Sequence, residues 1–289
     1  MTKVKKSCMI AAGIAFAILA VIFFFYDLEI SRVMVQEKPW FIFTLLAAIG
    51  ELPIYIGPIM FGVIYGFTSD NKKLKVVFHT IGLVMVYVAL IRITTGVFDE
   101  IYNSKVGTLQ YVLLPIVSLL IYLLIYMFVA KVQEATLFKL RDVALFGTIV
   151  SLISFGVVSG MKFLWGRPRY WSLSKDFSEY KNYLTINGIS KGLEGNQNRS
   201  FPSGHTNSAS CIMIIPFIIN RITNKKWLNI GAFVACCAYI LLVAISRICV
   251  GAHYASDVLF GFAINIICFI SVYIFLNKKG WLHVRNNKC

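Results

Sequence analysis

One polar segment reads Ser246-Arg247-Ile248-Cys249-Val250-Gly251-Ala252-His253-Tyr254-Ala255-Ser256-Asp257, and it separates the apolar runs 228–245 and 258–276. Runs of this length span a bilayer as helices, so the segment lies near a membrane surface. His253 and Asp257 are four residues apart and would share one face of a helix. Asp257 can then fix the tautomer of His253 and leave one ring nitrogen free to attack. The alternative is a capped helix with an incidental His–Asp pair.

The composition extends the membrane prediction to the whole chain. Of the 289 residues, 58% are hydrophobic and 14% are charged, which is too apolar for a soluble domain. We predict an all-α, polytopic integral membrane protein with about eight transmembrane helices. The apolar runs are 9–26, 41–67, 76–97, 109–130, 143–163, 205–220, 228–247 and 256–276. The first span is expected to be uncleaved, because no small-residue cleavage site follows it.

The distribution of Lys and Arg predicts the orientation. The net charge of +15 could suit nucleic acid or anionic lipid, but positive-inside topology also accounts for it. With a cytoplasmic N-terminus, 16 of the 28 basic residues fall in the inner segments. They are Lys3, Lys5, Lys6, Lys72, Lys73, Lys75, Lys131, Lys139, Arg141, Arg221, Lys225, Lys226, Lys278, Lys279, Arg285 and Lys288. We therefore expect a multi-pass cell-membrane protein with both termini in the cytoplasm and no nucleic-acid partner.

Two further motifs lie in the outer segment between the fifth and sixth spans. At its end, Phe201-Pro202-Ser203-Gly204-His205 precedes a helix whose free N–H groups could hold a phosphate. His205 could give or take a proton there, whereas Ser203 could also be a plain helix N-cap. At its start, the stretch from Lys162 to Tyr170 supplies three cations, which could instead snorkel at the interface. The topology places all three motifs on the same outer face.

These motifs resemble those of the type 2 phosphatidic acid phosphatases, a family within the superfamily shared with vanadium haloperoxidases. The family motifs are Lys-x6-Arg-Pro, Pro-Ser-Gly-His and Ser-Arg-x5-His-x3-Asp. This chain carries Lys162-x6-Arg169, Pro202-Ser203-Gly204-His205 and Ser246-Arg247-x5-His253-x3-Asp257, with Tyr170 where the family has Pro. The resemblance covers roughly 143–276. It implies a six-helix phosphatase core within 76–289, with an outer loop at 164–204 and two additional helices in 1–75.

The resemblance also implies the role of each site residue. His253 would attack phosphorus and become a phosphohistidine, and Asp257 would orient it. His205 would protonate the leaving oxygen and then activate water. The phosphoryl oxygens would be held by Lys162, Arg169, Ser203, Gly204 and Arg247. Such a site needs no metal or other cofactor, because fixed cations and N–H donors stabilise the transferred charge. Arg167 would contact either the phosphate or a lipid headgroup.

Several functions stay open at this point. Motifs at helix ends near the interface favour a lipid phosphate substrate: phosphatidic acid, phosphatidylglycerol phosphate or a polyprenyl diphosphate. One alternative is a lipid phosphotransferase with the same site, and another is a non-catalytic membrane transporter or lipid-binding protein. We infer no obligate protein partner. Glu51 and Arg92 lie within predicted spans, and either they pair, or both line a polar path to the site, or Glu51 is protonated and bonded to backbone freed by a proline.

Overall fold

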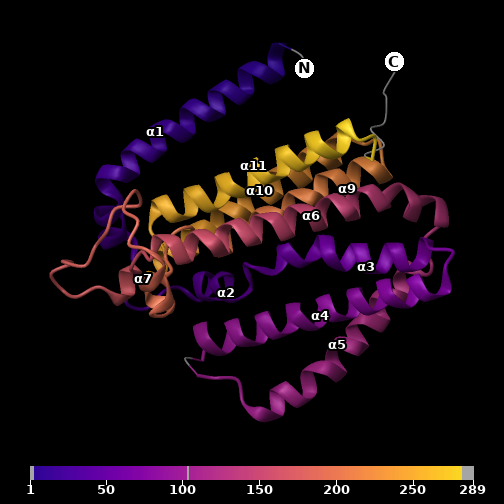
Figure 1. The fold of residues 1–289 in the computed structure, drawn as a ribbon, viewed down its shortest axis with the longest axis horizontal. Helices are drawn as coiled ribbons and strands as arrows, with labels where there is room; N and C mark the ends of the chain where they lie inside the picture. Colours follow the sequence, from indigo (N-terminus) through magenta and orange to yellow (C-terminus); the bar gives the residue numbers. More distant parts are fainter. Residues whose placement is uncertain (1–2, 103, 282–289) are drawn as a thin grey trace.

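The computed structural model describes residues 3–102 and 104–281 (Figure 1). Within these ranges the chain forms α-helices and short 3-10 helices and no strand, so the all-α prediction is confirmed. The α-helices are α1 (Lys3–Met34), α2 (Phe41–Ile49), α3 (Ile56–Thr68), α4 (Lys72–Glu100), α5 (Thr108–Val129), α6 (Glu134–Trp165), α7 (Ile189–Leu193), α8 (Gly204–Ser210), α9 (Ile214–Ile222), α10 (Lys226–Cys249) and α11 (Ala255–Lys278). The 3-10 helices are η1 (Leu52–Tyr55), η2 (Tyr170–Ser172), η3 (Asn196–Asn198) and η4 (Cys211–Met213).

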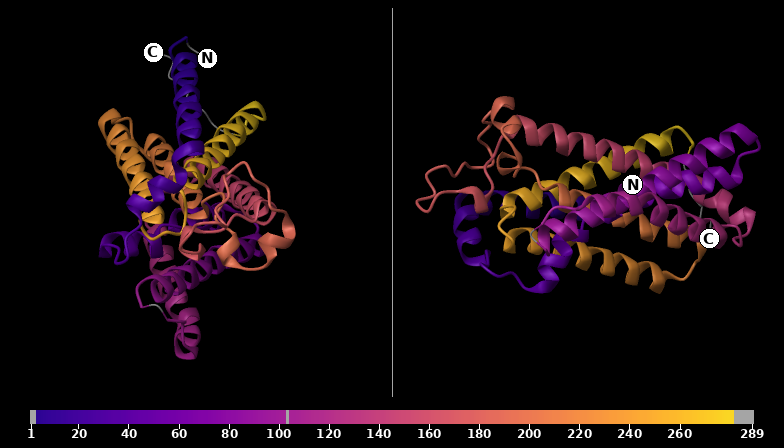
Figure 2. Two further views of the ribbon diagram at one scale, coloured as in Figure 1. Left: turned by 90° about the vertical axis from the view of Figure 1, so that its left-hand side faces the viewer. Right: turned by 90° about the horizontal axis from the view of Figure 1, so that it is seen from below.

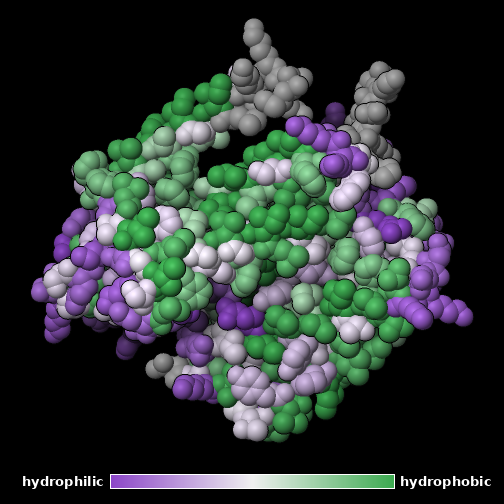
Figure 3. All heavy atoms as spheres, viewed as in Figure 1, coloured by the Kyte–Doolittle hydropathy of each residue, from purple (hydrophilic) through white to green (hydrophobic). Residues whose placement is uncertain are grey.

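Seven helical segments in the described part of the chain are long and apolar enough to cross a membrane. They are Ile10–Met34, Phe41–Thr68, Lys72–Glu100, Thr108–Val129, Glu134–Ser172, Lys226–Cys249 and Ala255–Lys278. A band of hydrophobic side chains accordingly lies between hydrophilic ends of the molecule (Figure 3). The polytopic membrane fold is therefore confirmed.

The predicted span 205–220 is not among these seven segments, although it is helical throughout. It consists of α8, η4 and α9 in direct succession. It runs alongside α6, with Asn207 near Ser154 at one end and Arg221 paired with Asp142 at the other. Several of its residues are polar and buried, among them Thr206, Asn207, Ser208 and Ser210. Because neighbouring helices enclose its polar part, this segment does not need an apolar surface there.

Close backbone packing joins the N-terminal helices to the rest. Gly57 of α3 lies against Gly147 of α6, and a Cβ on Gly57 would come within 2.4 Å of the Gly147 carbonyl carbon. Small residues allow such contacts and are a main source of helix association in membranes. A hydrophobic cluster of Phe146, Val150, Val272 and Leu276 packs α6 against α11. The division into 1–75 and 76–289 stays a prediction, since this packing does not show whether either part folds alone.

The second predicted span is broken in the middle, as its Pro and Gly residues indicate. Helix α2 ends at Ile49, η1 follows with Pro53 in its first turn, and α3 begins at Ile56. Helix α1 lies at the edge of the bundle and projects beyond it at its N-terminal end (Figure 2). Only 6% of the most apolar stretch of this helix, within Ile10–Met34, is buried inside the protein.

The segment between α6 and α8 folds over one end of the bundle, on the left in Figure 1. It is fixed to α6 by the Trp165 indole, which donates to the Tyr183 carbonyl at 2.6 Å. It is fixed to α1 by the Tyr183 hydroxyl, which donates to the Ala20 carbonyl at 3.0 Å. The junctions α3–α4, α5–α6 and α9–α10 lie at the opposite end. The three predicted motifs therefore meet at the end with the long outer segment.

Candidate active site

A cavity of about 1030 Å³ lies beneath this segment, between α4, α6, α8, α10 and the α2–η1 break. Six of the eight predicted site residues line it: Lys162, Arg169, Gly204, His205, Arg247 and His253. The other two, Ser203 and Asp257, are fully buried behind the wall. The structure thus brings all three motifs together around one cavity.

His253 lies just before α11, and Asp257 lies in the first turn of that helix. The expectation that both residues share a helix face was wrong, because the chain enters the helix only at Ala255. The Asp257 carboxylate turns back to accept from the Tyr254 backbone N–H at 2.9 Å, which caps the helix. This return brings Asp257 Oδ2 to 3.5 Å from His253 Nδ1, although no hydrogen bond closes the gap. The two side chains therefore lie close together by a different route, and the role of Asp257 in orienting His253 stays a prediction.

The environment of His253 favours a neutral ring. Its side chain is 1% exposed, and burial lowers its pKa well below the usual value. Asp257 opposes this effect, while Arg169 and Lys162 reinforce it. A neutral imidazole whose Nδ1 faces a carboxylate presents its other nitrogen as a lone-pair donor. This is the state that a nucleophilic histidine requires.

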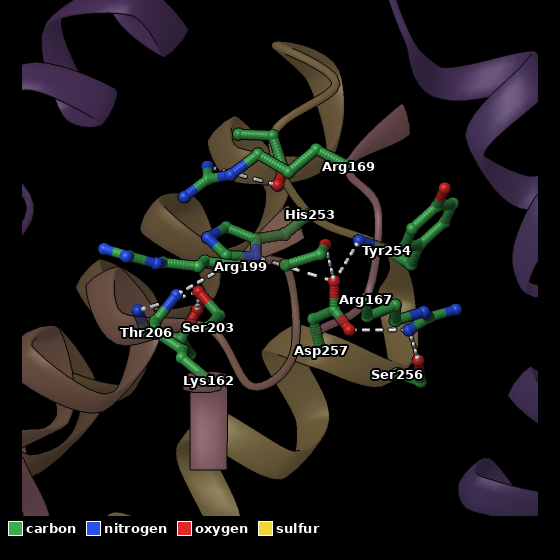
Figure 4. A network of polar contacts seen from close by, with 12 residues as sticks. Lys162, Arg167, Arg169, Arg199, Ser203, Thr206, His253, Tyr254, Ser256 and Asp257 are labelled. Carbon is green, nitrogen blue, oxygen red and sulfur yellow. Dashed lines mark hydrogen bonds and ion pairs between the residues drawn. The ribbon is translucent and has the colours of Figure 1, made fainter. Parts of the chain in front are cut away.

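Asp257 is the centre of a buried polar network (Figure 4). Its Oδ2 also accepts from the Ser200 hydroxyl, and its Oδ1 accepts from Arg167 at 2.6 Å. Arg167 donates further to the Ser256 hydroxyl at 2.8 Å and to Asp27 at 2.9 Å. The Asp257 carboxylate is therefore held on both oxygens, with Arg167 as the cation that it shares with Asp27.

The two expected roles of Arg167 were both wrong. Its side chain is 0% exposed, and it contacts neither the cavity nor the membrane surface. Instead it bridges Asp257 of α11 and Asp27 of α1, with the Tyr254 ring 4.1 Å from its guanidinium carbon. Only Arg can satisfy two carboxylates and a hydroxyl with one planar group. Asp27 is the residue that sequence reasoning missed here.

The three cations of the predicted phosphate site are anchored by backbone and side-chain oxygens. Lys162 Nζ donates to the Arg199 carbonyl at 2.8 Å, and Arg169 Nε donates to the Asn196 carbonyl at 2.9 Å. Arg247 donates to Glu100 at 2.9 Å. Tyr170, which replaces the family proline, begins η2 and packs edge-on against Tyr254. These contacts hold three basic side chains at the cavity wall, and Arg247 is paired with a carboxylate there.

The Pro-Ser-Gly-His motif forms the entrance to α8. The Ser203 hydroxyl accepts from the Thr206 backbone N–H at 3.3 Å, so Ser203 is the N-cap of this helix. Its backbone N–H donates to the Asp257 carbonyl at 2.9 Å, which ties α8 to α11. Gly204 and His205 follow directly and reach the cavity. Ser203 therefore serves the helix, and its expected contact with phosphate stays a prediction.

His205 has a carboxylate partner that the three motifs do not contain. Its Nδ1 lies 3.1 Å from Oε1 of Glu51, at the α2–η1 break. Glu51 also forms an ion pair with Arg92, so of the three alternatives for these residues the structure shows the pair. Both residues line the cavity. The sequence signal for a functional Glu51 was a carboxylate within a predicted span, followed by the helix-breaking Pro53. The contact between Glu51 and His205 was not predicted.

Among the described residues, no group of three or more His, Cys, Asp or Glu side chains could hold a metal ion. Metal independence stays a prediction, and it depends on the cations at the cavity. The arrangement is that of a helical membrane protein with two histidines and fixed cations at one polar cavity.

Residues 144–281 match the model of the PAP2 superfamily. The match contains every predicted site residue, and the resemblance inferred from the motifs is confirmed. One relative is phosphatidylglycerophosphatase B of Bacillus subtilis (strain 168), which is 37% identical over 79 residues, covering 25% of this chain and 37% of that protein. Another is bacitracin transport permease protein BcrC of Bacillus licheniformis, 30% identical over 106 residues, covering 37% of this chain and 48% of that protein. The chain thus spans less than half the length of either relative. No solved structure matches it.

Proposed function

We propose that this protein is a membrane lipid phosphatase that hydrolyses a phosphomonoester or pyrophosphate of a lipid through a phosphohistidine. The observation that carries the proposal is the convergence of His253, His205 and three cations on one cavity. The superfamily match and the printed name of one relative, a phosphatidylglycerophosphatase, support it. Candidate substrates are phosphatidic acid, phosphatidylglycerol phosphate and a polyprenyl diphosphate.

The proposed reaction has two steps. In the first, His253 forms a bond to phosphorus as the bond to the leaving oxygen breaks, and His205 gives that oxygen its proton. In the second, His205 takes a proton from water, whose oxygen displaces His253 from phosphorus. Inorganic phosphate leaves, and both histidines return to their starting states. Lys162, Arg169 and Arg247 hold the phosphoryl oxygens throughout, with Ser203 and the Gly204 N–H as further contacts.

The cavity lining supports a lipid substrate. Besides its charged wall, the cavity is lined by Ile54, Val88, Phe155 and Val158 from membrane-spanning helices. A phosphate headgroup can therefore lie among cations while an attached chain lies against apolar side chains. This combination suits a lipid phosphate better than a water-soluble phosphate ester.

The test is phosphate release from defined lipid phosphates by the purified protein, with and without an added lipid or sugar alcohol. A phosphatase releases phosphate into water in both conditions. A phosphotransferase would transfer the phosphoryl group mainly to the added alcohol. That result would show that the reaction is transfer and not the proposed hydrolysis. A transporter or lipid-binding protein would release none from any of the three candidates, and the proposal would then fail. The His253→Ala variant controls for contaminating phosphatases.

Activity is expected to survive chelation. Because the proposed site holds phosphate with side chains and N–H groups, EDTA should leave the rate of phosphate release unchanged. Vanadate should inhibit, because it adopts a five-coordinate form that resembles the transition state. The measurement is phosphate release after treatment with chelator and dialysis. Loss of activity in EDTA that Mg²⁺ restores would contradict this mechanism.

The cavity is expected to face the extracytoplasmic side. This orientation follows from the Lys and Arg count, and the structure offers an exposed position at each end for testing it. Lys175 lies in the segment over the cavity, and Lys225 lies in the α9–α10 junction. Single Cys replacements there should differ in their reaction with a membrane-impermeant thiol reagent on intact cells, with only position 175 labelled above the parent protein. Labelling of both positions from outside would contradict the proposed topology.

A further inference from the structure

The partner of His205 comes from outside the part of the chain that matches the superfamily. Glu51 precedes residue 144 by more than ninety positions, yet its Oε1 lies 3.1 Å from His205 Nδ1. It follows Gly50, where α2 ends, and precedes the Pro53 turn of η1. The contact therefore depends on a helix break in the second span.

Packing on both sides fixes the position of this break. A Cβ on Gly50 would lie 2.8 Å from a Val243 methyl group of α10. On the other side, Gly57 holds α3 directly against the α6 backbone at Gly147. The segment that carries Glu51 is thus held between α6 and α10, which also hold Lys162 and Arg247. A side chain placed in this way can orient another group within tenths of an ångström.

Each oxygen of the Glu51 carboxylate has its own partner. Oε1 faces His205, while Oε2 accepts from Arg92, whose Nε lies at 3.1 Å and whose terminal nitrogen also donates. A lone carboxylate within a membrane span is costly, and the ion pair with Arg92 offsets that cost. The Glu51 side chain is 21% exposed and therefore remains at the cavity wall.

The charges around His205 give Glu51 a chemical task. Burial is the main effect that disfavours a proton on the His205 ring, and Arg247, Arg169 and Arg92 add to it. Glu51 is the carboxylate that opposes them. An Nδ1–H donated to Oε1 also directs the other ring nitrogen away from Glu51, toward the space where substrate would lie. Without this carboxylate, the cations that bind phosphate would work against the acid that must protonate the leaving oxygen.

The two histidines thus differ in how their carboxylates are used. Asp257 is occupied by Arg167, Ser200 and the Tyr254 N–H, and it stays 3.5 Å from His253. Glu51 approaches His205 more closely, with Arg92 on its other oxygen. The closer carboxylate suits His205 for proton transfer, because the ring carries a positive charge in one of its two states.

We propose that Glu51 is a positioning residue for His205, which holds the ring in the tautomer for proton transfer and stabilises its protonated form. The inference rests on the proposed function, because it assigns a residue to the acid step of that reaction. The inference assigns a role in the reaction to the second span, which lies outside the three sequence motifs.

The test compares Glu51→Gln with the parent protein on two substrates. Glutamine keeps the size and an acceptor oxygen but removes the charge. On a lipid phosphate, kcat is expected to fall by about 10–100-fold, with KM little changed, as for loss of other groups that orient a functional histidine. On a nitrophenyl phosphate, whose leaving group needs no proton, release of the phenol in the first turnover should stay near the parent rate. Glu51→Asp keeps the charge and should restore part of the loss on the lipid.

Two further variants make the result specific. Glu100→Gln removes the other cavity carboxylate that pairs with a cation, but Glu100 pairs with Arg247 and not with a histidine. Its effect should be the same on both substrates. The double variant Glu51→Gln/His205→Ala should lose no more activity than His205→Ala, because both changes remove one function.

Other outcomes would overturn the assignment. Equal losses on both substrates, or additive losses in the double variant, would show that Glu51 does not act through His205. Loss of vanadate binding together with a lower thermal unfolding temperature would make Glu51 a structural residue. These outcomes presuppose a parent protein that releases phosphate from a lipid phosphate. An inactive parent protein would instead remove the proposed function.

Discussion

Replacement of His253 by alanine is expected to abolish phosphate release from every substrate, because no other side chain in the three motifs can replace it as nucleophile. Replacement of His205 should act selectively. A lipid alkoxide is a poor leaving group, and general acid–base help is worth about 10²–10⁴-fold, so His205→Ala should lose about that much on a lipid phosphate. A nitrophenolate leaves without a proton, so the first step on an aryl phosphate should be nearly spared.

The second step distinguishes the two histidines further. Without His205, water has no base, so phosphohistidine should accumulate and appear as a burst of phenol release. Rapid quenching and mass spectrometry should locate the phosphate on His253, and the double variant should lose it. Phosphate trapped on His205 would reverse the assignment. Equal losses on both substrates without a burst would remove the basis for assigning His205 as the acid.

Loss of Arg167 is expected to be the most destabilising single change near the site. Its side chain and those of Asp27 and Asp257 are all 0% exposed, so Arg167→Met leaves two buried carboxylates without their cation. Breaking such a buried pair typically costs about 3–5 kcal/mol. Thermal unfolding of the purified protein in detergent should show the loss. Lys191→Met is the matched control, since its pair with Glu194 is about half exposed and should contribute less than about 1 kcal/mol.

A second change tests the physical reason for that loss. If unbalanced charge causes the instability, adding Asp27→Asn to the Arg167→Met variant should restore part of the lost stability. The reason is that one of the two buried carboxylates is then replaced by a neutral amide. Asp257 is left unchanged because it faces His253. An Arg167→Met protein that unfolds at the parent temperature would contradict the account, and so would a double variant that is less stable than the single one.

Two kinds of local signal in the sequence predicted the membrane fold and the residues that form the site. Apolar runs of sufficient length identify spans, and fixed spacings such as His253 to Asp257 identify groups that meet. The partners that complete the site lie far away in the chain. Asp27 meets Ser256 across 229 positions, and Glu51 meets Arg92 across 41. Such contacts depend on how helices pack, which spacing does not encode.

Arg167 shows the limit of motif reasoning within a few residues. It lies two positions before Arg169, and both belong to the stretch that closes the fifth span. Side chains two residues apart in an extended chain point to the same side, so spacing alone would give the two arginines the same surroundings. Arg169 anchors at the cavity, whereas Arg167 enters the protein toward α1 and α11. Composition treats the two arginines alike, and only the fold separates them.

Asp27 also has a consequence for how the protein is made. Its carboxylate belongs to the first helix, and its partners follow much later: Arg167 lies 140 positions further on, and Ser256 lies 229 positions further on. During synthesis from the N-terminus, the ribosome therefore delivers the acid long before either partner exists. The Asp27 side chain cannot pair with Arg167 until α6 has emerged, and its contacts with Ser256 form only when α11 begins. Helix α1 is thus translated well before the residues that lock it in place.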